Sequence, residues 1–235
     1  MTENVQSEWT VDNELVQFFD EMNIIKSEKK ARVETARLML KKMNAFYHGL
    51  YLDILDGEYL HGKAEGDYID DLIAVYIGVV EKTDKSIMYD TDIINKSHSF
   101  ANQIMRTTRN QLSFEDDPEL QSMISAGVPI SEKRLPQYTK DSFAPDGWRA
   151  VEAAKNESLY IHNYKRHKEK KATQTTHTWV SMRDEFVRPA HAAADGQTVP
   201  INEPFIVGGY PLYYPGDVSA NPPAELVICC RCVEA

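Results

Sequence analysis

Apolar positions recur at three- and four-residue spacing through the first half of the chain, a pattern typical of amphipathic helices. The clearest stretches are residues 28–47, a stretch that begins at Asp67, and residues 91–112. Asp67 is a suitable N-cap residue, and further carboxylates follow in the first turn, where the helix dipole favours negative charge. Because apolar residues at helical spacing usually form a core, we predict a mainly helical region over residues 1–112.

The helical spacing is lost between residues 113 and 145. This segment contains internal prolines and an acidic cluster, so we predict a linker or irregular connection there. Structure should resume at Asp146, which we expect to cap a helix. The buried side of this helix should carry Trp148, Val151, Ala154, Ser158 and Ile161. This helix ends in the charged run 165–171, which we interpret as a solvated helix end in preference to a DNA contact.

Beyond residue 172 the pattern changes to short strands separated by turns that contain Gly or Pro. Strands are predicted at residues 175–181, 204–207 and 226–233. The predicted fold class is therefore α+β, with a mainly helical N-terminal region followed by a small α+β C-terminal domain with short strands. The expected parts are a helical region over 1–112, a connection over 113–145 and the C-terminal domain over 146–235.

The composition narrows the range of functions. A chain of 235 residues that are 42% hydrophobic can bury a sizeable core. Its formal net charge of -10 and pI near 5.2 argue against a protein whose main role is to bind nucleic-acid phosphates. The longest apolar run, residues 72–80, is far below the ~20 residues that cross a bilayer. The first residues, MTENVQSEW, also lack the pattern of a secretory signal. We therefore expect that the chain does not contact a membrane and that it stays in the reducing cytoplasm.

Common enzyme motifs are absent from the sequence. It contains no Gly-rich phosphate loop, no His-Glu-x-x-His and no Gly-x-Ser-x-Gly. We therefore predict that the chain is not an enzyme and has no catalytic residues.

All cysteines of the chain fall in one short segment near its C-terminus, unlike the spread-out cysteines of a disulfide framework. On a strand, Cys230 and Cys232 would point to the same face. Two thiolates and one imidazole suit a tetrahedral zinc ion, with His191 as the natural third ligand and Asp195 or His177 as a weaker fourth. The alternative is that the thiols are small buried hydrophobic groups, so a structural zinc ion is one of two predictions.

The C-terminal part carries an ordered set of residues that resembles a known family. In chain order they are Trp179, Asp184, Arg188 and His191 as R-x-x-H, Asp195-Gly196, Phe205, Pro215-Gly216-Asp217 and Cys230-Arg231-Cys232. Residues 146–235 are thus similar to the C-terminal signature of the phage Mu F-like head morphogenesis family. The segment 154–157 resembles the family's helical segment, but Lys155 and Asn156 depart from it. Cys229 stands where the family usually has Asn.

The resemblance implies a phage minor head protein that is present in few copies in the virion, inside the head near the portal vertex. It implies contacts with the portal protein and with the major capsid or scaffold protein, and a role in head assembly or DNA delivery. The host cytoplasm is the implied location before assembly. Two alternatives are a nucleic-acid-binding virion protein, through Lys165 to Lys171, and the remnant of a Mu F toxin of the ADP-ribosyltransferase type.

The motif residues also suggest local contacts. Pro189 can open a short helix, so that Arg188 and His191 share a face. If Asp184 lies near Arg188, the ion pair would orient the guanidinium group and hold His191 in one tautomer. We interpret this set as a buried polar cluster that fixes the loops of a small domain, because no residue nearby completes a catalytic set.

Overall fold

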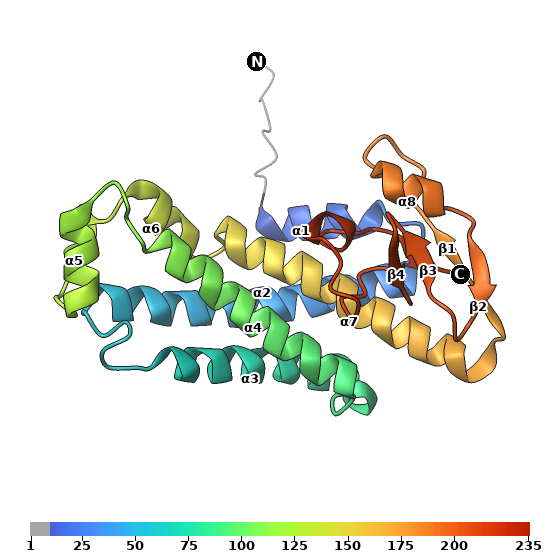
Figure 1. Ribbon diagram of the computed structural model, residues 1–235, viewed down its shortest axis with the longest axis horizontal. Helices are drawn as coiled ribbons and strands as arrows, with labels where there is room; N and C mark the ends of the chain where they lie inside the picture. The colour runs from blue at the N-terminus through green and yellow to red at the C-terminus, as the bar shows by residue number, and fades with distance from the viewer. Residues whose placement is uncertain (1–9) are drawn as a thin grey trace, which may run out of the picture.

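The long helices lie side by side in an elongated bundle, and the strands are gathered at one end of it (Figure 1). This computed structural model describes residues 10–235, so the inference about a secretory signal falls outside the described residues. The bundle consists of α1 (Val11–Asp20), α2 (Lys26–Leu55), α3 (Glu65–Thr83), α4 (Thr91–Gln111) and α7 (Trp148–Thr173). The most extensive packing joins α2 to α7, and α3 pairs with α4. The predicted α+β fold class is confirmed.

The predicted helices are present, with shifts at their ends. Helix α3 begins two residues before Asp67, whose carboxylate accepts a hydrogen bond of 3.0 Å from the backbone N–H of Ala64. Asp67 therefore stabilises the first turn from its third position and is not the N-cap itself. Helix α2 extends well past residue 47, to Leu55, because Leu50 and Ile54 continue its buried face.

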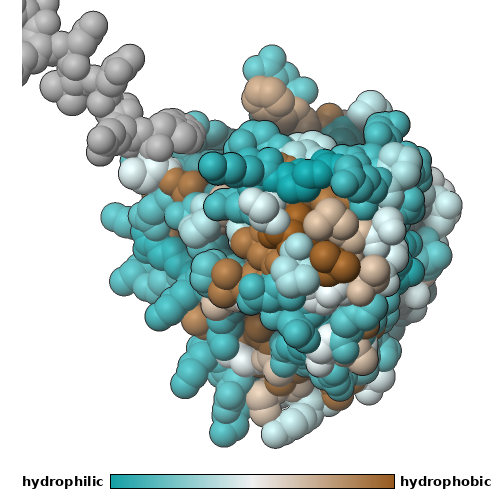
Figure 2. Space-filling model, turned by 90° about the vertical axis from the view of Figure 1, so that its left-hand side faces the viewer, coloured by the Kyte–Doolittle hydropathy of each residue, from teal (hydrophilic) through white to brown (hydrophobic). Residues whose placement is uncertain are grey.

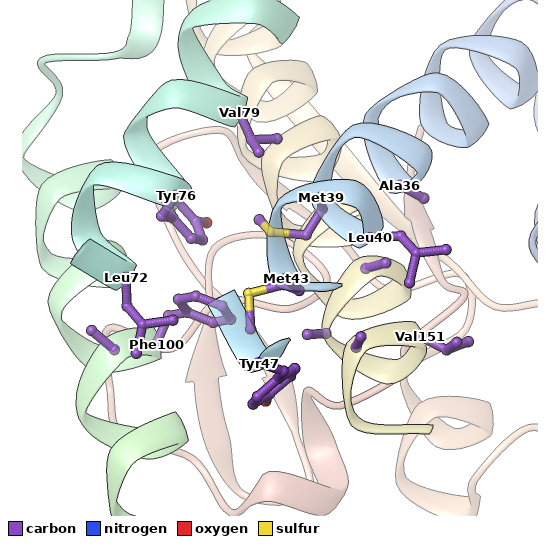
Figure 3. Close-up of a cluster of buried hydrophobic side chains, with 14 of the residues drawn as sticks. Ala36, Met39, Leu40, Met43, Tyr47, Leu72, Tyr76, Val79, Phe100 and Val151 are labelled. Carbon is purple, nitrogen blue, oxygen red and sulfur yellow. The ribbon is translucent and has the colours of Figure 1, made fainter. Parts of the chain in front are cut away.

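The helices share one hydrophobic core. Figure 3 shows part of it, where Met39 and Met43 of α2 lie between side chains of α3 and α7. Tyr76 of α3 packs against Phe100 of α4, with their ring centroids 5.4 Å apart. This core also takes in Tyr214 from the C-terminal part, so it crosses the boundaries predicted from the sequence.

The segment 113–145, predicted as an irregular connection, forms short helices instead. They are α5 (Pro118–Ala126), the 3-10 turn η2 (Glu132–Arg134) and α6 (Gln137–Phe143). Asp117 caps α5 by accepting a hydrogen bond of 3.1 Å from Leu120. Arg134 donates to the same carboxylate, and this contact lowers the pKa of Asp117 to about 2. The acidic cluster therefore contains a helix cap, which periodicity does not detect because caps depend on single residues.

The start of α7 also differs from the prediction. Gly147 is the N-cap of α7, and Asp146 has a positive φ of 56°. The carboxylate of Asp146 instead accepts a hydrogen bond of 2.7 Å from Asn44 of α2. Trp148, expected on the buried side, is 63% exposed. The rest of that predicted side, Val151, Ala154, Ser158 and Ile161, is buried.

The C-terminal strands form two small antiparallel sheets. Strand β1 (Thr176–Val180) lies between β2 (Thr198–Pro200) and β5 (Val233–Glu234). Strands β3 (Phe205–Val207) and β4 (Tyr210–Leu212) form a hairpin. The register places Trp179 opposite Glu234 and His177 opposite Val199.

The strand predicted at residues 226–233 is wrong over most of its length. The 3-10 turn η3 (Ala224–Leu226) starts this segment, and only Val233 of the predicted range pairs with β1. Cys229 adopts a left-handed φ of 48°, and its N–H donates to the Asn156 side chain at 2.5 Å. A residue in this conformation cannot continue a β-ladder, so the chain turns at the cysteines.

A second, smaller hydrophobic cluster lies beneath the C-terminal strands. Its buried members are Trp179, Ala194, Phe205, Val207, Leu212, Leu226, Cys230 and Cys232. The division into parts at residues 112 and 145 stays a prediction about folding units. Across residues 10–235, every helix is too short or too polar for a membrane-spanning segment.

Candidate metal centre

Trp179 occupies the middle of the smaller cluster. Its side chain is fully buried, and its ring meets those of Phe205 and His191 edge-on, at centroid distances of 5.4 and 5.7 Å. Gly196, with a φ of 79°, turns the chain so that its N–H donates to the Trp179 carbonyl at 2.8 Å. The Asp195-Gly196 turn therefore holds β1 against the short helix α8 (Pro189–Ala194).

Helix α8 presents His191 to two thiols. The Nδ1 atom of His191 lies 3.5 Å from Sγ of Cys230 and 3.4 Å from Sγ of Cys232, and all three side chains are buried. The structure thus brings together the residues that the sequence proposed as metal ligands. The reason differs from the one expected, because Cys230 and Cys232 lie between the turn at residues 227–229 and β5, and not on a strand.

The hydrogen bond between the two thiols changes the pKa of both. A hydrogen bond from Cys232 lowers the pKa of Cys230, and His191 acts in the same direction. The same hydrogen bond, together with burial, raises the pKa of Cys232. The pair therefore favours one thiolate, and both sulfur atoms lie beside the same imidazole nitrogen. A thiolate of this kind can serve as a metal ligand, because only the deprotonated sulfur binds a metal ion.

The geometry fits tetrahedral zinc. Bond lengths of about 2.3 Å to sulfur and 2.0 Å to nitrogen place sulfur and nitrogen ligands about 3.5 Å apart, as both Cys–His pairs are here. A pocket of about 200 Å³, lined in part by Phe186 and Arg188, adjoins the three ligands. Among the described residues, the buried Nε2 atom of His191 has no hydrogen-bond partner.

The fourth ligands suggested by the sequence lie elsewhere. Asp195 accepts hydrogen bonds from the Ser181 backbone at 2.8 Å and from Arg183 at 2.7 Å, and these contacts lower its pKa. His177 contacts Glu234, in a separate cluster. A metal ion at the thiols would therefore have three protein ligands and a fourth position towards the pocket.

The expected ion pair between Asp184 and Arg188 does not form. Asp184 pairs with Arg231 at 2.8 Å, and Arg188 donates to the Ile228 carbonyl at 2.7 Å. Arg231 also pairs with Glu21, just after α1, at 2.9 Å. The Cys-Arg-Cys motif is therefore tied to the N-terminal helices, a contact across the chain that local spacing cannot reveal.

Two departures from the family pattern meet in the structure. Cys229, which stands where the family usually has Asn, donates its backbone N–H to Asn156, one of the two unusual residues in the segment 154–157. The Cys229 thiol contacts Glu152 at 3.1 Å and points away from the other two thiols. Burial, and then this carboxylate, raise the pKa of Cys229 to about 12, so it stays protonated.

The basic run 165–171 is largely used within the protein. Lys165 pairs with Asp84 at 3.0 Å, Arg166 with Glu28, and Lys168 with Asp90. These pairs neutralise much of the charge that a DNA contact would need. The run was predicted to be a solvated helix end, but part of it packs against acidic neighbours.

The comparisons with known proteins address the C-terminal part. Residues 120–235 match the family described as Phage Mu protein F like protein. No curated protein and no solved structure matches the chain. The match starts before the boundary expected at residue 146, so it takes in most of α5 and all of α6 and α7 together with the strands. Residues 120–235, which contain the candidate metal centre, therefore carry the domain of the phage Mu protein F-like family, a family of head morphogenesis proteins.

Proposed function

We propose that this chain is a minor protein of a phage head, placed in few copies at the portal vertex. It would bind the portal protein and the major capsid or scaffold protein, and would help head assembly or DNA delivery after a stage in the host cytoplasm. The observation that carries this proposal is the family match over residues 120–235. The acidic net charge of -10 supports protein contacts over DNA contacts.

One end of the bundle is the best candidate for the surface that binds the portal protein. Leu52 near the end of α2, Val128 after α5 and Tyr138 of α6 are exposed by 44%, 44% and 54%. The backbone N–H of Ile130 donates to the Leu55 carbonyl at 2.7 Å, which brings these elements together. In Figure 2, which faces this end, apolar residues gather near the middle and hydrophilic ones surround them. Such an arrangement is typical of protein contact sites.

Replacing both Val128 and Tyr138 by Asp should weaken capture of the portal protein by the full chain by about tenfold or more, because central aromatic anchors dominate interfaces. Tyr89→Asp is the matched control. Tyr89 is 79% exposed and lies between α3 and α4, at the other end of the bundle (Figure 1). If the double variant of Val128 and Tyr138 captures as much portal protein as the wild type, the contact lies elsewhere on the chain. A wild-type chain that captures no portal protein would contradict the proposed role.

We also propose that His191, Cys230 and Cys232 hold a structural zinc ion. Cys230→Ser and His191→Ala should each lower the zinc content by about one equivalent per chain and lower the melting temperature, because a lost ligand opens the site. Cys229→Ser, whose thiol faces Glu152, should keep the metal. Elemental analysis and a melting curve with chelator provide the test. A melting temperature that chelator and reconstitution leave unchanged would favour plain burial of the thiols.

A further inference from the structure

A second buried cluster lies where α7, β1 and β5 meet. His167 of α7 and His177 of β1 each direct Nδ1 at Oε1 of Glu234 in β5, at 3.2 and 2.8 Å. The side chains of His177 and Glu234 are completely buried, and that of His167 is 8% exposed. These groups belong neither to the family signature nor to the thiol centre.

The hydrogen bonds of His177 fix which of its nitrogens is free. Its Nε2 atom lies 2.9 Å from the backbone carbonyl of Glu203, which can only accept, so Nε2 carries the hydrogen. In a neutral ring Nδ1 then holds a lone pair. That lone pair faces the carboxylate oxygen of Glu234 at 2.8 Å. Two acceptors cannot approach in this way unless a positive centre lies between them.

The carboxylate of Glu234 also lacks a positive partner. Its second oxygen, Oε2, is buried and has no hydrogen-bond partner within residues 10–235. Arg166 donates at 3.0 Å to the backbone carbonyl of Glu234, and its other guanidinium nitrogen pairs with Glu28. Burying a carboxylate oxygen without a partner is costly, whereas a bound cation would compensate the charge of the group.

We propose that His167, His177 and Glu234 form a second metal site that binds a divalent transition ion of the zinc type. Two imidazoles and one carboxylate are a common ligand set for such ions. The three ligand atoms lie within 4.8 Å of one another, so small side-chain adjustments reach the spacing of about 3.4 Å found around tetrahedral zinc. The contact from His177 to Glu203 is of the kind that fixes the tautomer and orientation of metal-bound histidines.

The surroundings of His167 provide access to the site. It lines a pocket of about 340 Å³ together with Tyr213 and Asp217. An ion can enter from this side, and a water molecule can complete its coordination. The bound ion would join the last strand, β5, to the long helix α7 and thereby fasten the C-terminal sheet to the bundle.

The test separates the two metal sites within the full chain. In a Cys230→Ser, Cys232→Ser background, purified protein reconstituted with Zn²⁺ and desalted should retain about one equivalent of zinc. Adding Glu234→Gln should remove it, whereas adding Glu225→Gln, a control carboxylate on η3, should not. With Co²⁺ in place of Zn²⁺, the retained site should lack the charge-transfer band of a thiolate ligand. No retained metal in the double-cysteine background, or no loss with Glu234→Gln, would overturn the proposal.

The wild-type chain gives a second test that does not depend on variants. Titration with Zn²⁺ should shift the Nδ1 resonance of His177 in a nitrogen NMR spectrum of the imidazoles, while Nε2 keeps its hydrogen. If His177 instead carries hydrogens on both nitrogens and does not respond to Zn²⁺, a proton occupies the gap and the metal site is refuted.

Discussion

Replacing Trp179 by alanine should destabilise the C-terminal part by about 3 to 5 kcal/mol, the usual cost of removing a buried aromatic side chain. Trp179 is fully buried, and its ring contacts both Phe205 and the metal-centre residue His191. A cavity here removes packing that no neighbour can replace. Denaturant unfolding followed by circular dichroism measures the loss, which is large compared with the total stability of a typical domain.

Trp148→Ala is the matched control for this experiment, because Trp148 is 63% exposed at the start of α7. Its loss should change the free energy of unfolding by less than about 1 kcal/mol, as expected for a surface position. Equal effects of the two substitutions would contradict the placement of Trp179 at the centre of the smaller core.

A fragment of residues 146–235 should fail to fold cooperatively, although the sequence predicts that it is a domain. Helix α7 packs along α2, and its buried face would be exposed in the fragment. Polar contacts would be lost as well. Arg32 of α2 is fully buried and donates to Asn163 of α7 at 2.8 Å, while Ser158 donates to the Arg32 carbonyl at 2.7 Å. Loss of both kinds of contact removes the support for α7.

The measurement compares the fragment with the full chain. The fragment should show poor dispersion in a nitrogen–proton NMR spectrum and no sharp thermal transition, and it should bind a dye for exposed apolar surface. A well-dispersed spectrum and a cooperative melt would show that the strands and α7 fold without the N-terminal helices. In that case the boundary predicted at residue 146 would hold.

The sequence by itself determined the helices, the fold class and the family. Helical spacing depends on which residues face the core, so residues 28–47 and 91–112 revealed α2 and α4 directly. The order of motif residues from Trp179 to Cys232 indicated the family that the match over residues 120–235 establishes. The grouping of His191 with Cys230 and Cys232 was also predicted, from ligand chemistry and from a strand that would place both thiols on one face, although that strand was wrong.

Only the tertiary structure decided how these parts are joined. The pairing of Arg231 with Asp184 and Glu21 links positions far apart in the chain, which no local pattern encodes. The second cluster needs α7, β1 and β5 to meet, so the sequence gives no spacing by which His167, His177 and Glu234 could be grouped. The core that runs through the predicted boundaries arises for the same reason. The sequence pattern indicates which face of a helix is buried. Which other element of the chain covers that face depends on the packing of the whole chain.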